Sequence, residues 1–236
     1  MNVITDYICL DLETTGLHPK RDRIIEIGAV KVRKGRVTET FHHLIDPEMK
    51  LEERIMELTG ITDKELQGSP RLEEVLPELE EFLGEDVLVG HRIEFDYAFL
   101  KRAFVNRNRA FEKQGIDTLR LARVLVPDCT SKRLESLCSH FGIELKAHRA
   151  LEDARATFHL YQRLIGEVKE GETEYLLQPI PLLFKVKKEG PLTKTQGERL
   201  HQLTSRYGIE LGIEIQSLTK NEASRYLDYI YSNYGR

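Results

Sequence analysis

The stretch YICLDLETTGL, residues 7–17, decides the fold prediction for this chain. It runs through apolar residues typical of a buried strand and then places two carboxylates, Asp11 and Glu13, on either side of one leucine. Successive side chains of a strand point to opposite faces, so both carboxylates share one face. Two like charges held together are costly unless a cation lies between them. A metal would compensate the two charges, but an isolated D-x-E pair more often belongs to a strand that ends in solvent, with TTG as an ordinary turn.

Composition limits the possible classes of protein. With 236 residues, 40% hydrophobic and 31% charged, the chain is long enough to bury one substantial core and a small additional unit. No apolar run approaches the roughly 20 residues of a membrane span, and the N-terminal residues lack a secretory signal pattern. The three cysteines show no CxxC spacing, which argues against a disulfide framework or a zinc site. We therefore expect a cytoplasmic protein with no membrane partner.

Hydrophobic periodicity predicts a mixed α/β domain. Two of the strands are joined at Lys34-Gly35 as a hairpin, and helical patterns follow with turn residues between them. An open sheet covered by helices is the expected result. The predicted strands are 6–11, 23–33, 36–45 and 86–90, and the predicted helices are 51–58, 71–83, 95–105, 118–125, 131–141 and 150–166.

Two further stretches place polar residues where a strand or loop leads into a helix. In HRIEFD, residues 91–96, the first helical turn carries Asp96, which also fits a carboxylate that complements the helix dipole. In HRALED, residues 148–153, His148 precedes a helix and Asp153 lies in its first turn. A lone histidine in such a place is more often structural than catalytic. The combination of the three stretches favours chemistry.

The three stretches, in this order and at these separations, resemble the motifs of the DEDDh 3′-5′ exonucleases. The particular relatives that it resembles are the epsilon proofreading subunit of bacterial DNA polymerase III and the exonuclease domain of the Gram-positive replicative polymerase. It extends over about residues 5–165 through LTGITD (58–63), DTLRLAR (117–123) and LESLCSHFGI (134–143). It implies a ribonuclease-H-like fold with a five-stranded mixed sheet flanked by helices. The catalytic residues it implies are Asp11, Glu13, Asp96, Asp153 and His148.

The chemistry of these residues agrees with the resemblance. Carboxylates are hard oxygen ligands that suit Mg²⁺ or Mn²⁺, and two such ions about 4 Å apart clamp the attacking and leaving oxygens of a phosphodiester. A histidine is suited to take the proton of the attacking water, and a nucleoside 5′-monophosphate would be released. The alternatives are an exonuclease of RNA 3′ ends and a non-catalytic nucleic-acid or polymerase-binding module. A pure binding module has no need for such a costly cluster, so the enzyme is favoured.

Candidate substrate contacts follow from the same resemblance. The substrate would be a nucleic acid with a free 3′ end, most simply single-stranded or frayed DNA. Leu17 is expected to pack against the terminal base, although a plain core or turn residue also fits it. Arg92 stands where many relatives have asparagine and would add a phosphate contact. The substrate-binding candidates are Thr14, Thr15, Gly16, Leu17, His91, Arg92 and Phe95.

The C-terminal part of the chain differs from the rest. We predict an exonuclease domain over 1–170, a linker over 171–192 and a helical hairpin over 193–236, which opens its second helix with a capping box, TKNE (219–222). Five of the nine tyrosines lie in the hairpin, which fits either a surface that stacks single-stranded bases or a stripe packed on the nuclease or a partner. The peptide QPIPLLF (178–184) faintly resembles peptides that bind the sliding clamp, apart from its two prolines.

Overall fold

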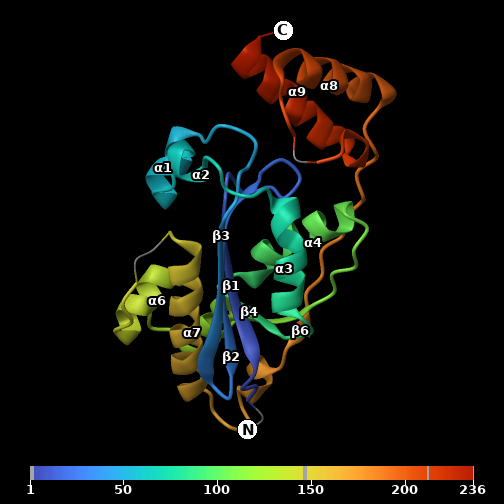
Figure 1. Cartoon of the computed structure of the whole chain (residues 1–236). Coiled ribbons are helices and arrows are strands. Elements are labelled where there is room, and N and C mark those ends of the chain that lie inside the picture. The colour runs from blue at the N-terminus through green and yellow to red at the C-terminus, as the bar shows by residue number, and fades with distance from the viewer. Residues whose placement is uncertain (1–2, 146–147, 212, 236) are drawn as a thin grey trace.

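A six-stranded mixed sheet lies at the centre of the computed structural model, which describes residues 3–145, 148–211 and 213–235 (Figure 1). The strand order is β3-β2-β1-β4-β5-β6, with β1-β4 and β4-β5 parallel and the other neighbours antiparallel. The mixed sheet is confirmed, but it has one strand more than expected. The strands are β1 (Tyr7–Thr14), β2 (Ile24–Arg33), β3 (Arg36–Leu44), β4 (Leu88–Gly90), β5 (Gln114–Asp117) and β6 (Ile180–Pro181).

Helices cover both faces of this sheet. Figure 1 shows α6 and α7 on one side and α3 and α4 on the other. None of the helices in the described ranges is long and apolar enough to cross a bilayer. The α-helices are α1 (Glu53–Thr59), α2 (Asp63–Leu66), α3 (Leu72–Leu83), α4 (Ile93–Asn106), α5 (Thr118–Leu125), α6 (Leu134–Phe141), α7 (Ala150–Gly166), α8 (Lys194–Tyr207) and α9 (Lys220–Tyr234), and the 3-10 turns are η1 (Glu174–Leu177) and η2 (Ile215–Ser217).

Strand β1 feeds two separate cores because its side chains alternate. Ile8 and Leu10 are fully buried in the cluster that contains α3 and α4, whereas Tyr7 and Cys9 are fully buried in the cluster that contains α7. Asp11 and Glu13 continue the α7 face of the strand. The two carboxylates therefore lie on one face, as the alternation predicted.

Gly28 brings α7 into direct contact with the sheet. It lies opposite Asp11 in the β1–β2 register, and a Cβ built on it would be 2.1 Å from the backbone of Ala150 and Leu151. Real Cβ contacts are never this short, so only glycine permits the approach. The first turn of α7 is thereby seated over Asp11, and this turn carries Asp153.

The segment expected to be a linker contributes to the nuclease fold. Leu176 and Leu177 of η1 are buried in the α7-side core, and Leu182 is buried in the other core. Between them, β6 pairs antiparallel with β5. The count of five strands came from the resemblance, and periodicity alone indicated neither β5 nor β6, because strands of four and two residues are too short to show a period.

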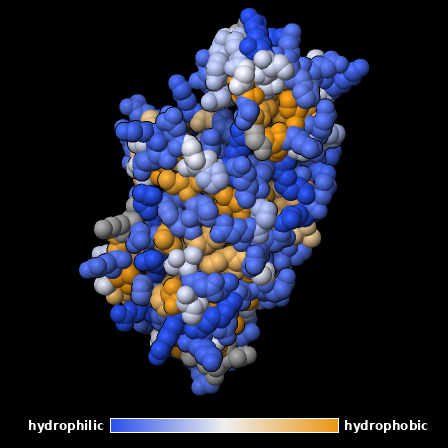
Figure 2. Space-filling model, in the orientation of Figure 1, coloured by the Kyte–Doolittle hydropathy of each residue, from blue (hydrophilic) through white to orange (hydrophobic). Residues whose placement is uncertain are grey.

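The C-terminal hairpin has a core of its own. Helices α8 and α9 pack through a buried cluster that includes Leu200, Leu203 and Ile230. The capping box at Thr219 and Glu222 is confirmed. Figure 2 shows hydrophobic atoms gathered over the hairpin and along the middle of the same face, between hydrophilic ones. The described ranges leave out a few residues of the exonuclease domain and the hairpin that the sequence predicts, namely 1–2, 146–147, 212 and 236.

Ion pairs join this hairpin to α4 and α3. Arg107, the residue directly after α4, contacts Glu222 of α9 at 2.8 Å and Glu73 of α3 at 2.5 Å. Arg102 pairs with Glu189, whose other carboxylate oxygen accepts the Thr219 hydroxyl at 3.0 Å. All these charged side chains are mostly buried, so the pairs are screened less by salt than surface pairs would be.

Replacing Gly28 by alanine tests the contact between α7 and the sheet. Because the new methyl would overlap helix backbone, we expect Gly28→Ala to lower the free energy of unfolding by about 3 kcal/mol. Gly166→Ala is the matched control. Gly166 lies at the end of α7, and a Cβ built on it would have no atom within 4 Å. Urea denaturation of both variants measures the difference; equal stabilities would show that the helix can shift freely.

Candidate active site

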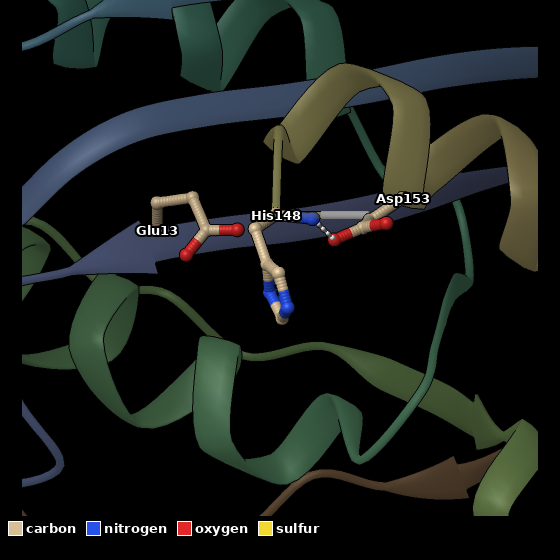
Figure 3. Close-up of side chains that lie close together, drawn as sticks. All are labelled: Glu13, His148 and Asp153. Atoms are coloured by element: carbon tan, nitrogen blue, oxygen red, sulfur yellow. Dashed lines mark hydrogen bonds between the residues drawn. The ribbon is translucent and has the colours of Figure 1, made fainter. Parts of the chain in front are cut away.

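Three side chains meet at the end of β1. They come from β1 itself, from the loop before α7 and from α7. Glu13, His148 and Asp153 each offer a ligand atom, and these atoms lie within 4.8 Å of one another. Figure 3 shows Glu13 facing His148 from one side, with Asp153 on the other side at the start of α7. The structure thus brings together residues that are 135 and 5 positions apart in the sequence, as the motifs predicted.

Asp96 completes the carboxylate set from α4. Its side chain is buried, and its Oδ1 accepts the Leu12 N–H at 3.2 Å. The parallel pairing of β1 with β4 occurs at Ile8 and Cys9, so the Leu12 N–H lies beyond the end of that ladder. Asp96 therefore takes the place of a strand partner, which fixes its carboxylate next to Asp11 and Glu13.

Burial and mutual repulsion raise the pKa values of this cluster. Burial raises the pKa of Asp11 well above its ordinary value, and Asp96, Asp153 and Glu13 add to the effect. Burial also raises the pKa of Asp96 strongly. The pKa of Glu13 is raised to about 8 by burial and then by Asp153 and Glu26. Burial raises the pKa of Asp153 to about 6, although the His148 N–H opposes this.

This donor set fits a divalent cation. Asp153 Oδ2 accepts the His148 N–H at 3.0 Å, whereas its Oδ1 is buried without a hydrogen-bond partner. Within the described ranges, no Lys or Arg forms an ion pair with Asp11, Glu13, Asp96 or Asp153. Four oxygen-donor groups that form no ion pair with a described Lys or Arg make a donor set that suits a hard cation such as Mg²⁺ or Mn²⁺.

His148 has a conformation that the sequence did not predict. Its φ is +68°, in the left-handed region, and its backbone N–H is bonded to Asp153. The ring is 40% exposed, and Nε2 lies 3.1 Å from Glu135 Oε1 on α6. This contact leaves Nδ1 free of hydrogen bonds to the described part of the chain. Glu135 was missed because it belongs to none of the three motifs.

Glu26 is a second residue that the motifs did not reveal. It is fully buried on β2, directly opposite Glu13 in the register. Its carboxylate accepts hydrogen bonds from the Arg149 guanidinium at 3.0 Å and from the Ala150 N–H at 2.9 Å, and His42 Nε2 lies 2.7 Å away. Glu26 thus anchors the first turn of α7. The only signal was a glutamate inside the apolar run IIEIGAV (24–30).

The loop after β1 presents some of the substrate-binding candidates. Thr15 is buried and its Oγ1 accepts the Arg23 N–H at 2.9 Å, so it closes the loop rather than facing outward. Gly16 packs against Asp22, whose carboxylate would be 2.4 Å from an added Cβ. The Thr14 hydroxyl donates to the Gly16 carbonyl at 2.7 Å. Leu17 is 71% exposed, so the core alternative for it is wrong.

The candidates from the second motif have different surroundings. Both ring nitrogens of His91 have protein partners, the Thr118 hydroxyl at 2.9 Å and the Lys132 carbonyl at 2.8 Å, and burial lowers its pKa. Arg92 is exposed, with its guanidinium 5.7 Å from the centre of the Phe95 ring. His91 and Arg92 line a cleft of about 470 Å³ that also includes Asp11, Lys132, His148 and Asp153.

Comparison with known proteins places the chain in a family. A family model named for RNase T and described as an exonuclease matches residues 8–161. The chain belongs to the exonuclease family. It is 39% identical over 166 residues to the DNA polymerase III PolC-type of Clostridium perfringens, and 42% identical over 173 residues to that of Halalkalibacterium halodurans. These matches cover 70% and 72% of this chain but only 12% of either relative.

Solved structures share the fold of this family member. Exonuclease X in complex with 5′ overhanging duplex DNA superposes with a TM-score of 0.56 at 23% identity, covering 73% of this chain and 99% of that one. E. coli Exonuclease I in complex with a dA16 oligonucleotide gives a TM-score of 0.58 at 20% identity, covering 74% and 42%. The predicted ribonuclease-H-like fold is confirmed.

The stability of the metal-free protein should depend on pH through this cluster. Glu13 and Asp153 have pKa values of about 8 and about 6 when folded, whereas carboxylic acids of an unfolded chain ionise near pH 4. The folded state therefore binds more protons between about pH 4 and pH 8, and its free energy of unfolding falls as the pH rises through this window. Mg²⁺ should reverse the fall by compensating the ionised groups.

Denaturation in EDTA between about pH 5 and 8 measures this effect. Asp153→Asn should flatten the fall relative to the wild type, because asparagine does not ionise. Glu94→Gln is the control, since Glu94 lies exposed in the first turn of α4. A wild type and an Asp153→Asn variant with the same pH dependence would contradict the prediction.

Proposed function

We propose that this chain is a metal-dependent 3′-5′ exonuclease that releases nucleoside 5′-monophosphates from DNA 3′ ends. The observation that carries the proposal is the meeting of Glu13, His148 and Asp153 within 4.8 Å, next to Asp11 and Asp96. Membership of the exonuclease family supports the reaction class. The 3′ polarity rests on the three motifs, and the preference for DNA is supported by relatives named as DNA polymerases.

The four carboxylates would hold two divalent cations, Mg²⁺ or Mn²⁺. Such a pair polarises the phosphodiester and stabilises charge on the attacking and leaving oxygens. Asp11 and Glu13 present their oxygens from one strand face, Asp153 adds its unpartnered Oδ1, and Asp96 is fixed by the Leu12 N–H. These side chains are held by strand and helix backbone, so little reorganisation is needed when substrate binds.

His148 would accept the proton of the attacking water at Nδ1. Its Nε2 lies 3.1 Å from Glu135 Oε1 on α6, and its backbone N–H is bonded to Asp153 on α7, so one contact acts on the ring and the other fixes the backbone that carries it. A base oriented by a carboxylate on its other nitrogen is a recurrent arrangement for proton transfer. The ring's 40% exposure gives it access to solvent and substrate.

The substrate end would lie in the cleft beside the cluster. Leu17 is exposed for packing against a base, and Arg92 is exposed for contact with a phosphate. His91 would act by positioning, because both of its nitrogens are already bonded. An RNA substrate and a non-catalytic binding role are the alternatives. Incubation with end-labelled single-stranded DNA and RNA, with and without Mn²⁺, decides between them.

A partner role with a DNA polymerase is also proposed, from the polymerase names of the relatives. Clamp binding through residues 178–184 is not included in the proposal. Ile180–Pro181 pair with β5 and Leu182 is buried, so that peptide would have to leave the sheet to enter a partner's groove. Leu183 is 83% exposed and Phe184 is 37% exposed, so these two side chains lie outside the buried part of the peptide.

Loss of one carboxylate should abolish hydrolysis. Asp11→Asn and Asp153→Asn keep the shape of the side chain but remove an anionic ligand, so we expect no nucleotide release with Mg²⁺ or Mn²⁺. The wild type should stop when EDTA is added and recover with metal. Asp128→Asn, at an exposed site before α6, should retain full activity. Normal release by either cluster variant would refute the two-metal arrangement.

Loss of His148 should separate rate from binding. We expect His148→Ala to slow single-turnover hydrolysis by roughly 10²- to 10⁴-fold while DNA binding stays nearly unchanged. The wild-type rate should rise with pH as the general base loses its proton, and the variant should lose this dependence. His159→Ala, an exposed histidine of α7, is the control. An unaltered rate and pH profile would assign His148 a structural role only.

A further inference from the structure

A groove of about 480 Å³ lies where α9 meets the nuclease domain. One wall comes from α9 and the other from the loop before α1 and the loop after β1. Neither the three motifs nor the proposed chemistry uses these residues. Its main lining side chains are Arg21, Met49, Lys50, Arg225, Tyr229 and Asn233.

The groove combines exposed apolar surface with positive charge. Tyr229 is 45% exposed and Met49 is 41% exposed, so the groove offers an aromatic ring and an apolar side chain to a ligand. Arg21 and Lys50 are exposed, and neither forms an ion pair with any part of the chain that the structure describes. Aromatic faces for stacking and cations for phosphates are the two features of surfaces that bind single-stranded nucleic acid.

Two carboxylates also line the groove, and they differ in surroundings. Glu48 is turned toward Arg71, with Arg71 Nε 3.2 Å from its Oε1, and its side chain is 10% exposed. Asp228 is exposed on α9. The groove therefore presents two unpaired exposed cations against one exposed anion, and this balance favours an anionic ligand.

The groove is tied to the carboxylate cluster through a single loop. β1, which carries Glu13, runs directly into the loop 15–23, and the Thr15 N–H donates to the Arg23 carbonyl at 2.8 Å to close it. This loop carries the exposed Leu17 three residues after the end of β1, and its Arg21 lines the groove. A strand bound at the cluster can therefore continue across the loop toward α9.

The opposite wall is fixed relative to the nuclease. The Arg107–Glu222 pair anchors the first turn of α9, and one turn later the Arg71 guanidinium lies 5.2 Å from the centre of the Tyr226 ring. Tyr229 follows Tyr226 by three residues on the same helix, so its position is set by these contacts. A stacking residue held in this way loses little freedom when a base binds.

We propose that this groove binds the single-stranded part of the substrate on the 5′ side of the nucleotides at the carboxylate cluster. Tyr229 stacks a base, and Arg21 and Lys50 contact phosphates without reading sequence. The inference rests on the proposed exonuclease function, because it assigns the direction of the strand from that site. It gives the hairpin a role in holding long substrates, with no part in the chemistry.

Equilibrium binding of oligothymidylates in EDTA tests the groove without hydrolysis. Fluorescence anisotropy compares dT24 with dT4, which the proposal assigns to the carboxylate cluster alone. We expect Tyr229→Ala to weaken dT24 binding by about tenfold and to leave dT4 binding unchanged. Tyr229→Phe should retain the wild-type affinity, since stacking needs only the ring. Tyr175→Ala, an exposed tyrosine of η1, is the matched control.

The charges are tested in the same assay. The double variant Arg21→Ala/Lys50→Ala should weaken dT24 binding and lower the slope of log Kd against log salt by about 1.4, which is about 0.7 for each phosphate contact. Asp228→Asn should tighten dT24 binding, because it removes the exposed anion. Lys34→Ala/Arg36→Ala, in the turn between β2 and β3 at the other end of the sheet, should change neither quantity.

The outcomes separate this inference from the proposed function. Wild-type dT24 affinity in Tyr229→Ala and in Arg21→Ala/Lys50→Ala would overturn the groove proposal, even for an active nuclease. A length-dependent loss of binding in these variants would support the groove even if no hydrolysis were found. In an active enzyme, the same variants should raise KM for dT24 and leave kcat unchanged, whereas a fall in kcat alone would contradict a binding role.

Discussion

The close approach of α7 to the sheet over Gly28 is the constraint on which the rest of the structure depends. It holds Asp153 over a strand face that already carries Asp11 and Glu13, with Asp96 fixed from the other side. Like charges at this distance oppose folding in the absence of a cation. The two cores formed by the alternating residues of β1 supply the apolar burial that offsets this opposition. Packing thus maintains the cluster against the repulsion between its carboxylates. A ligand that neutralises these carboxylates relieves the repulsion, and the relief adds to its binding free energy.

Glu26 shows how the fold keeps the cluster open to such a ligand. Arg149 is adjacent to His148 and would be an obvious counterion for Glu13, yet it is engaged by Glu26, which is buried on the neighbouring strand. A buried carboxylate that binds a guanidinium and a helix N–H at once is well satisfied. The arginine is therefore engaged in anchoring the helix, and it forms no ion pair with the carboxyl groups of the cluster.

Local sequence patterns predicted the parts of the site that depend on periodicity. The shared face of Asp11 and Glu13 follows from strand alternation, and Asp153 follows from the first turn of a clearly amphipathic helix. The motifs did not reveal Glu26 and Glu135 as part of the site, because their partners are set by strand register and by packing between distant segments. The left-handed backbone of His148 escaped because a non-glycine residue seldom adopts it. β6 was not predicted because a strand of two residues is too short to show an alternation of apolar and polar side chains.

The two edges of the sheet have a further consequence. An exposed edge strand offers unpaired N–H and C=O groups to which a second copy of a protein can add, which leads to aggregation. β6 ends one edge after only two residues, and Pro181 has no N–H to offer. At the opposite edge, β3 begins with exposed residues that include Arg36 and Glu39. Both borders are poor templates for another chain, so the protein should tolerate high concentration without sheet-to-sheet association.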